Sequence, residues 1–157
     1  MKNIIKAVIT ALFLALIIIP ANVSAAASDN EIIYNDETGI PDKNLYRAIL
    51  VELGKKGKEK TFTRKEAKSL KELYIGREGV DVYSLKGIEY LENLEEFDIS
   101  VNIKDLRGME KLSKLTYVNF DDFNLKGYNY SPIGKIKNLK KLRISECNLT
   151  DKKLKEI

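Results

Sequence analysis

Apolar residues in the second half of the chain follow a mixed spacing that neither a helix nor a strand produces alone. In the segment LENLEEFDIS, residues 91–100, apolar side chains are separated by gaps of three, three and two. An amphipathic helix uses gaps of three and four, and a half-buried strand uses gaps of two. The last part of the segment, Phe97 to Ile99, therefore predicts a short strand. The residues before it predict a turn that sends every third side chain inward.

The same spacing occurs four times, in the pattern L-x-x-L-x-I with apolar substitutions, at steps of 24, 21 and 24 residues. The copies are Leu70, Leu73, Ile75; Leu94, Phe97, Ile99; Leu115, Val118, Phe120; and Leu139, Leu142, Ile144. Three copies also share upstream apolar positions: Leu85, Ile88, Leu91; Leu106, Met109, Leu112; and Tyr130, Ile133, Ile136. One turn of such a chain cannot bury its apolar edge alone, so we expect stacked coils that share one continuous core.

This framework resembles the leucine-rich repeat, and its short coils resemble those of the bacterial internalins. The segments concerned are YSLKGIEYLENLEEFDIS, KDLRGMEKLSKLTYVNF and SPIGKIKNLKKLRIS. The preceding stretch, GIPDKNLYRAILVELGKKGKEKTFTRKEAKSLKEL, resembles the internalin N-terminal cap. The resemblance implies an α/β fold, a leucine-rich-repeat solenoid with a short parallel sheet and a small helical N-terminal cap.

Two helices are predicted in the cap region. Asp42 can cap a first helix, which Gly54 is suited to end. Thr63 and Glu66 form the capping-box pattern T-x-x-E at the start of a second, shorter helix. The first helix would place four apolar residues on one face: Leu45, Ala48, Ile49 and Leu53.

We predict three segments: a signal peptide over residues 1–25, the helical N-terminal cap over 26–69, and leucine-rich repeats over 70–157. Lys2 and Lys6 precede an apolar run that ends before Pro20, and Val23-Ser24-Ala25 is a small-residue cleavage site. The run is shorter than the ~20 residues of a membrane span. We therefore expect a secreted protein with no membrane span after cleavage.

The last coil is expected to be incomplete or closed by a short helix. The repeat spacing would then turn Leu154 and Ile157 inward. An incompletely covered last coil predicts weak, concentration-dependent self-association.

Composition excludes some classes of function. Lys and Arg number 27 against 23 acids, and cleavage would lower the formal charge from +4 to +2 by removing two lysines. So small a charge argues against a nucleic-acid binder, which needs a basic face. The single cysteine, Cys147, allows no internal disulfide.

The sequence also lacks the usual signs of catalysis. It contains no histidine, the commonest general base at neutral pH. It contains no G-x-S-x-G, phosphate-loop or paired-cysteine motif. We therefore expect no catalytic residues, no metal site and no cofactor.

The outward side chains of the predicted strands are the candidate binding site, because alternate residues of a strand point to opposite faces. The internalin resemblance implies that partners bind on this inner-curve face. From the first predicted strand to the last, this face changes from acidic with an aromatic residue, through polar, to basic. The candidate ligand-binding residues are Glu72, Tyr74, Glu96, Asp98, Tyr117, Asn119, Lys141 and Arg143. A third row would consist of Gly76, Ser100, Asp121 and Ser145.

These patterns predict a secreted, non-catalytic binding module that recognises a protein through the concave sheet face. Its partner would belong to a host cell or to the bacterial envelope. Two alternatives stay open: a truncated fragment of a larger surface protein, and the targeting arm of a missing enzymatic domain.

Overall fold

The computed structural model describes residues 28–55, 57, 60–76, 80–121, 129–146, 150–155 and 157. The predicted signal peptide, residues 1–25, and Cys147 lie outside the described residues.

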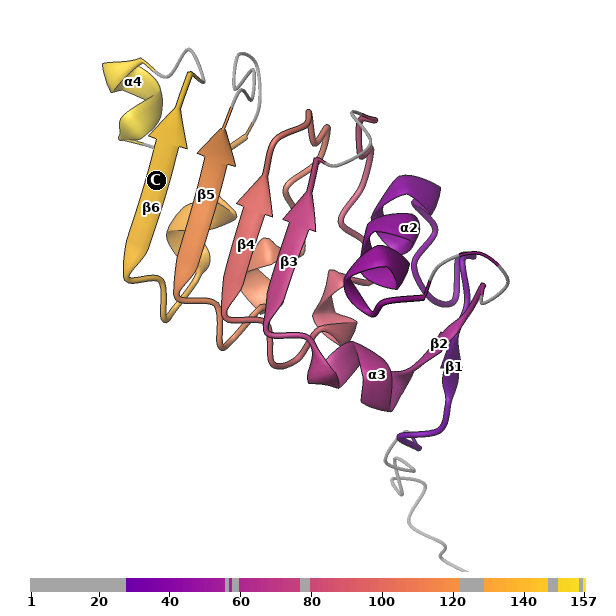
Figure 1. The fold of residues 1–157 in the computed structure, drawn as a ribbon. Coiled ribbons are helices and arrows are strands. Elements are labelled where there is room, and N and C mark those ends of the chain that lie inside the picture. Colours follow the sequence, from indigo (N-terminus) through magenta and orange to yellow (C-terminus); the bar gives the residue numbers. More distant parts are fainter. Residues whose placement is uncertain are drawn as a thin grey trace, which may run out of the picture.

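A four-stranded parallel sheet forms the centre of the molecule (Figure 1). Its strands lie side by side in chain order: β3 (Glu72–Ile75), β4 (Glu96–Ile99), β5 (Tyr117–Asp121) and β6 (Lys141–Ser145). The register aligns equivalent positions of the four sequence copies, with Leu73, Phe97, Val118 and Leu142 in one row. The predicted strands and their relative register are confirmed.

Three short 3₁₀ helices lie behind the sheet, one before each of the last three strands (Figure 1). They are η1 (Ile88–Tyr90), η2 (Met109–Lys111) and η3 (Ile133–Lys135). Gly87 and Gly108 precede the first two with φ angles of 87° and 108°, a left-handed conformation that favours glycine. Pro132 precedes the third with φ of −62°, so this coil begins with a different turn.

The core lies between the strands and these helices. The upstream apolar positions of all three coils are buried, as predicted. So are the inward residues of β3, β4 and β5. Those of β6, Leu142 and Ile144, are only partly buried but pack against the same core. One apolar cluster therefore runs through the repeats, as the spacing predicts.

Both predicted N-terminal helices are present. The first, α2 (Lys43–Glu52), buries Leu45 and Ile49, and the second, α3 (Arg64–Ser69), begins with the predicted capping box. Helix α2 packs against β3. Tyr46 is also buried on α2, although the predicted apolar face did not include it.

Asp42 joins α2 to the repeats through both oxygens of its carboxylate. Its Oδ1 accepts hydrogen bonds from the backbone N–H groups of Asn44 and Leu45, at 2.9 and 3.0 Å. Its Oδ2 accepts from the N–H groups of Tyr83 and Ser84, at 2.6 and 3.1 Å. The side chain is thus both the predicted helix cap and a tether between two parts of the chain.

A two-stranded antiparallel sheet, which was not predicted, accompanies the helices. It pairs β1 (Ile32–Ile33) with β2 (Phe62–Thr63). The Tyr46 hydroxyl donates to the carbonyl of Ile33 at 2.7 Å, and its ring centroid lies 4.9 Å from that of Phe62. This contact explains why α2 buries a tyrosine.

The C-terminal part contains the expected short helix but not the expected packing. Helix α4 (Asp151–Leu154) places Leu154 with 55% of its surface exposed, so the prediction that it points inward is wrong. The helix ends at Leu154, and the spacing that would bring Leu154 and Ile157 onto one face does not continue. Ile157 is partly buried against the core, close to Gly134.

Candidate functional site

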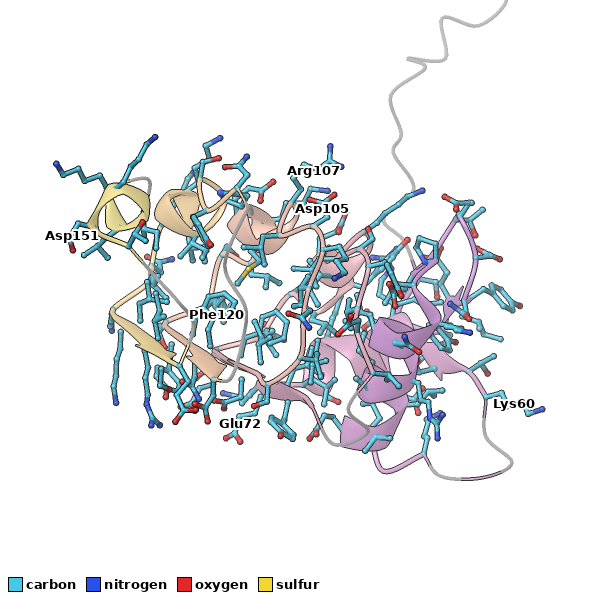
Figure 2. All side chains as sticks on the ribbon, turned by 90° about the horizontal axis from the view of Figure 1, so that it is seen from above. Lys60, Glu72, Asp105, Arg107, Phe120 and Asp151 are labelled. Atoms are coloured by element: carbon cyan, nitrogen blue, oxygen red, sulfur yellow. The ribbon has the colours of Figure 1, made fainter. Side chains whose placement is uncertain are left out.

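The structure brings all eight candidate residues together on the outward face of the parallel sheet. Strand register sets them in two rows: Glu72, Glu96, Tyr117, Lys141; and Tyr74, Asp98, Asn119, Arg143. We call these two rows the sheet face. Figure 2 shows Glu72 on the opposite side of the molecule from Asp105 and Arg107, with the buried ring of Phe120 between them.

Charge is divided along the sheet face. The exposed carboxylates of Glu72 and Glu96 stand on β3 and β4, and the exposed cations of Lys141 and Arg143 stand on β6. The remaining four residues are half-buried. Within the part of the chain that the structure describes, Glu72, Glu96, Asp98 and Arg143 take part in no ion pair.

The middle of the face contains polar groups with few contacts. The Lys141 ammonium lies 5.0 Å from the centroid of the Tyr117 ring, a cation–π distance. Beside it, Asn119 has a buried side-chain oxygen with no hydrogen-bond partner among the described residues. Burying an oxygen without a hydrogen bond is costly, so this position lowers the stability of the fold.

Gly76 makes room for Tyr74 at one end of the face. A Cβ atom at Gly76 would lie 2.7 Å from the Tyr74 hydroxyl and 2.9 Å from Cβ of Ser100. The absence of a side chain therefore lets the Tyr74 ring lie along the strand. In the third row, Ser145 donates a hydrogen bond to Asp121 at 2.7 Å.

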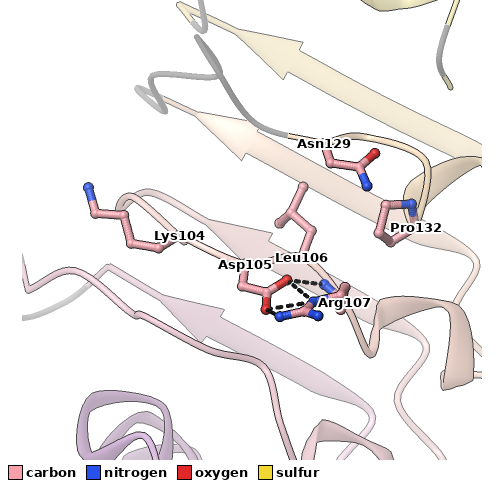
Figure 3. A pocket seen from close by; sticks show the side chains of 6 residues that line it. All are labelled: Lys104, Asp105, Leu106, Arg107, Asn129 and Pro132. Carbon is pink, nitrogen blue, oxygen red and sulfur yellow. Dashed lines mark hydrogen bonds and ion pairs between the residues drawn. The ribbon is translucent and has the colours of Figure 1, made fainter.

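The side of the molecule opposite the sheet face carries ion pairs. Arg107 forms hydrogen bonds and an ion pair with Asp105, and Lys111 pairs with Glu89 at 2.7 Å. The Arg107 guanidinium holds the pKa of Asp105 below its ordinary value, mainly through the side-chain hydrogen bond. Figure 3 shows the Asp105–Arg107 pair at a pocket of about 270 Å³, whose lining also includes Lys104, Leu106, Asn129 and Pro132.

Asparagine side chains at the turns that precede two strands bond to the segment of chain before them, helix α3 in one case and the previous coil in the other. Asn93 donates to the carbonyl of Lys68 at 2.7 Å, and Asn138 donates to that of Ser113 at 2.5 Å. Sequence analysis did not identify these bonds. The common position of both asparagines, one residue before the first leucine of a copy, was the available signal.

The described residues contain neither a metal-binding cluster nor a helix suited to span a membrane. Those residues contain no group of three or more Cys, Asp or Glu side chains placed to hold a metal ion. They also contain no helix of the length and apolar character that a membrane span requires.

Comparison with known proteins shows which solved structures this fold resembles. No protein-family model matches the sequence, and no curated protein matches it. Solved structures do match. One is internalin InlF from Listeria monocytogenes, at 30% identity and a TM-score of 0.54, over 71% of this chain and 32% of that one. Another is internalin C2 from the same organism, at 28% identity and a TM-score of 0.59, over 71% of this chain and 48% of that one.

The chain is an internalin-like leucine-rich-repeat protein. It spans between about a third and a half of the length of the two internalins it matches. The comparison confirms the predicted resemblance and the α/β fold with a parallel sheet.

Proposed function

We propose that this internalin-like chain is a secreted, non-catalytic module that binds a protein through its sheet face. In this proposal the repeats form a small solenoid, and residues 26–69 cap its N-terminal end. Residues 1–25 are the signal peptide that directs secretion. The partner would be a protein of a host cell or of the bacterial envelope.

The observation that carries the proposal is the set of charged and aromatic side chains collected on one exposed surface. Glu72, Glu96 and Arg143 are exposed there without an ion pair in the described part of the chain. Tyr74 and Tyr117 lie among them, and tyrosine and arginine are residue types enriched at binding hot spots. On the opposite side, the Arg107 guanidinium is already paired with Asp105.

The area of the face limits the strength of binding. Four strands at ~4.8 Å spacing and about five residues per strand give a face of roughly 300 Å². A standard protein interface buries roughly 800 Å² on each partner. The sheet face alone therefore supports a transient complex.

The test is capture of proteins from host-cell and envelope extracts by the chain without residues 1–25. Changing Tyr74, Tyr117 and Arg143 to alanine should abolish capture while circular dichroism stays native. A matched control changes Tyr34, Tyr83 and Arg107, two exposed tyrosines and one exposed arginine away from the sheet face. Loss of capture in the control alone would move the binding site off the sheet.

A further inference from the structure

The sheet face has a charge distribution that complements itself. Its acids stand on β3 and β4, and its bases stand on β6 at the other end of the same sheet. A second copy could therefore present bases where the first presents acids. The strand order and register decide which rotation brings the acids of one copy opposite the bases of the other.

Two rotations bring the sheet faces of two copies together with their strands aligned. A two-fold axis across the strands would set each strand against its own equivalent. Because this axis also reverses the strand direction, the two rows exchange, so Glu96 would oppose the partner's Asp98 and Lys141 the partner's Arg143, which is repulsive. A two-fold axis parallel to the strands reverses their order instead, so that β3 opposes the partner's β6 and β4 opposes the partner's β5.

The second arrangement makes each opposing pair chemically favourable. Glu72 opposes the partner's Lys141, a carboxylate against an ammonium. Tyr74 opposes the partner's Arg143, a pair suited to a cation–π contact. Asp98 opposes the partner's Asn119, whose amide can donate a hydrogen bond, and Glu96 opposes the partner's Tyr117. Because the contact is isologous, each pair occurs twice.

We infer that the chain forms a weak symmetric dimer in which the sheet faces of two copies dock with parallel strands, β3 of each against β6 of the other. The inference rests on the proposed function because it uses the same sheet face. The partner that it names is a second copy of this chain. Strand directions within about 30° are usual between sheets packed face to face. A face of roughly 300 Å² per copy is small for a stable dimer, so we expect a dissociation constant on the order of 0.1–1 mM.

The test is sedimentation equilibrium of the chain without residues 1–25, over a protein range that reaches about 1 mM. The wild type should show a monomer–dimer equilibrium that weakens as salt rises from about 0.05 to 1 M, because salt screens exposed charges. Glu72→Lys and Lys141→Glu should each weaken self-association about tenfold or more, because each sets like charges opposite one another. Lys137→Glu is the matched control, an exposed turn lysine of the same coil, and it should leave self-association unchanged.

An equimolar mixture of the Glu72→Lys and Lys141→Glu proteins is the decisive sample. In a mixed dimer each half pairs Lys with Glu again, so association should return to the wild-type level. A monomeric wild type, unaffected single variants or a mixture that fails to associate would each overturn the dimer. None of these outcomes bears on heterologous capture, which the tyrosine and arginine variants test separately.

Discussion

The two edge strands of the sheet, β3 and β6, occupy equivalent positions in the repeat but differ in burial. Leu73 and Ile75 on β3 are only 1% and 3% exposed. Their counterparts on β6, Leu142 and Ile144, are half-buried. Helix α2 packs against β3, whereas on α4, which lies next to β6 in Figure 1, the side chain of Leu154 is exposed to solvent. The burial of a repeat therefore depends on what packs against it, because each repeat contacts only its neighbours.

The charged side chains near the two edge strands also differ, because those beside β3 form ion pairs and, in the described part of the chain, several beside β6 do not. Beside β3, Lys71 pairs with Glu95 at 2.6 Å, and Arg64 pairs with Glu31 at 3.0 Å. Beside β6, several exposed lysines form no ion pair within the described residues: Lys135, Lys137 and Lys140. The β3 edge is therefore tied to its surroundings, and the β6 edge presents free cations to solvent.

The largest expected effect comes from the same substitution at equivalent sites of the two edges. Leu73→Ala should lower the free energy of unfolding by about 2–5 kcal/mol, because it leaves a cavity in a closed part of the core. Leu142→Ala should cost only about 1 kcal/mol, because its side chain is already half in water. Urea unfolding of both variants measures the difference. Equal losses would show that the two edges are packed alike.

The next largest loss of stability is expected when the Asp42 carboxylate, which joins α2 to the repeats, is removed. Asp42→Ala should cost about 2–4 kcal/mol, because it removes a helix cap and leaves further backbone donors unpaired. Asp151→Ala, at the start of α4, is the matched change at the β6 edge and should have little effect on the urea midpoint. A mild Asp42→Ala phenotype would mean that α2 holds to the repeats through apolar packing alone.

The smallest effect is a dependence of stability on pH. The hydrogen bond from Lys55 and those from Thr63 hold the pKa of Glu66 below its ordinary value. A lowered pKa in the folded state adds stability above the ordinary glutamate value of about 4.3, and this is lost as pH falls through the folded value. The wild type should therefore lose slightly more stability than Glu66→Gln between about pH 6 and pH 3. Identical losses in the two urea series would rule out this role for Glu66.

Most of the repeat region was predictable because its physical signal is periodic. Each strand occurs at the same offset in its copy, so errors in one copy are corrected by the others. The same periodicity predicted which side chains share the sheet face, including the pairing of Glu72 with Glu96 and of Tyr117 with Lys141. The capping residues Asp42 and Thr63 were predictable from local chemistry.

What could not be predicted depends on contacts between distant segments or on the end of a pattern. Strands β1 and β2 have two residues each, too few for an alternating pattern, and they pair across about thirty residues of chain. The burial of Tyr46 follows from that pairing. Leu154 was placed inward by extending the repeat beyond its last strand, where α4 replaces the repeat geometry.

Binding through the sheet face can be tested by capture with two charge-balanced variants. One changes Glu72, Glu96, Lys141 and Arg143 to alanine on the sheet face. The other changes Glu89, Asp105, Arg107 and Lys111 to alanine on the opposite side. Each removes two acids and two bases, so net charge stays constant. We predict that the first variant loses its partner proteins from host-cell and envelope extracts and that the second retains them. Retention by the first variant with loss by the second would place the binding site on the side opposite the sheet face.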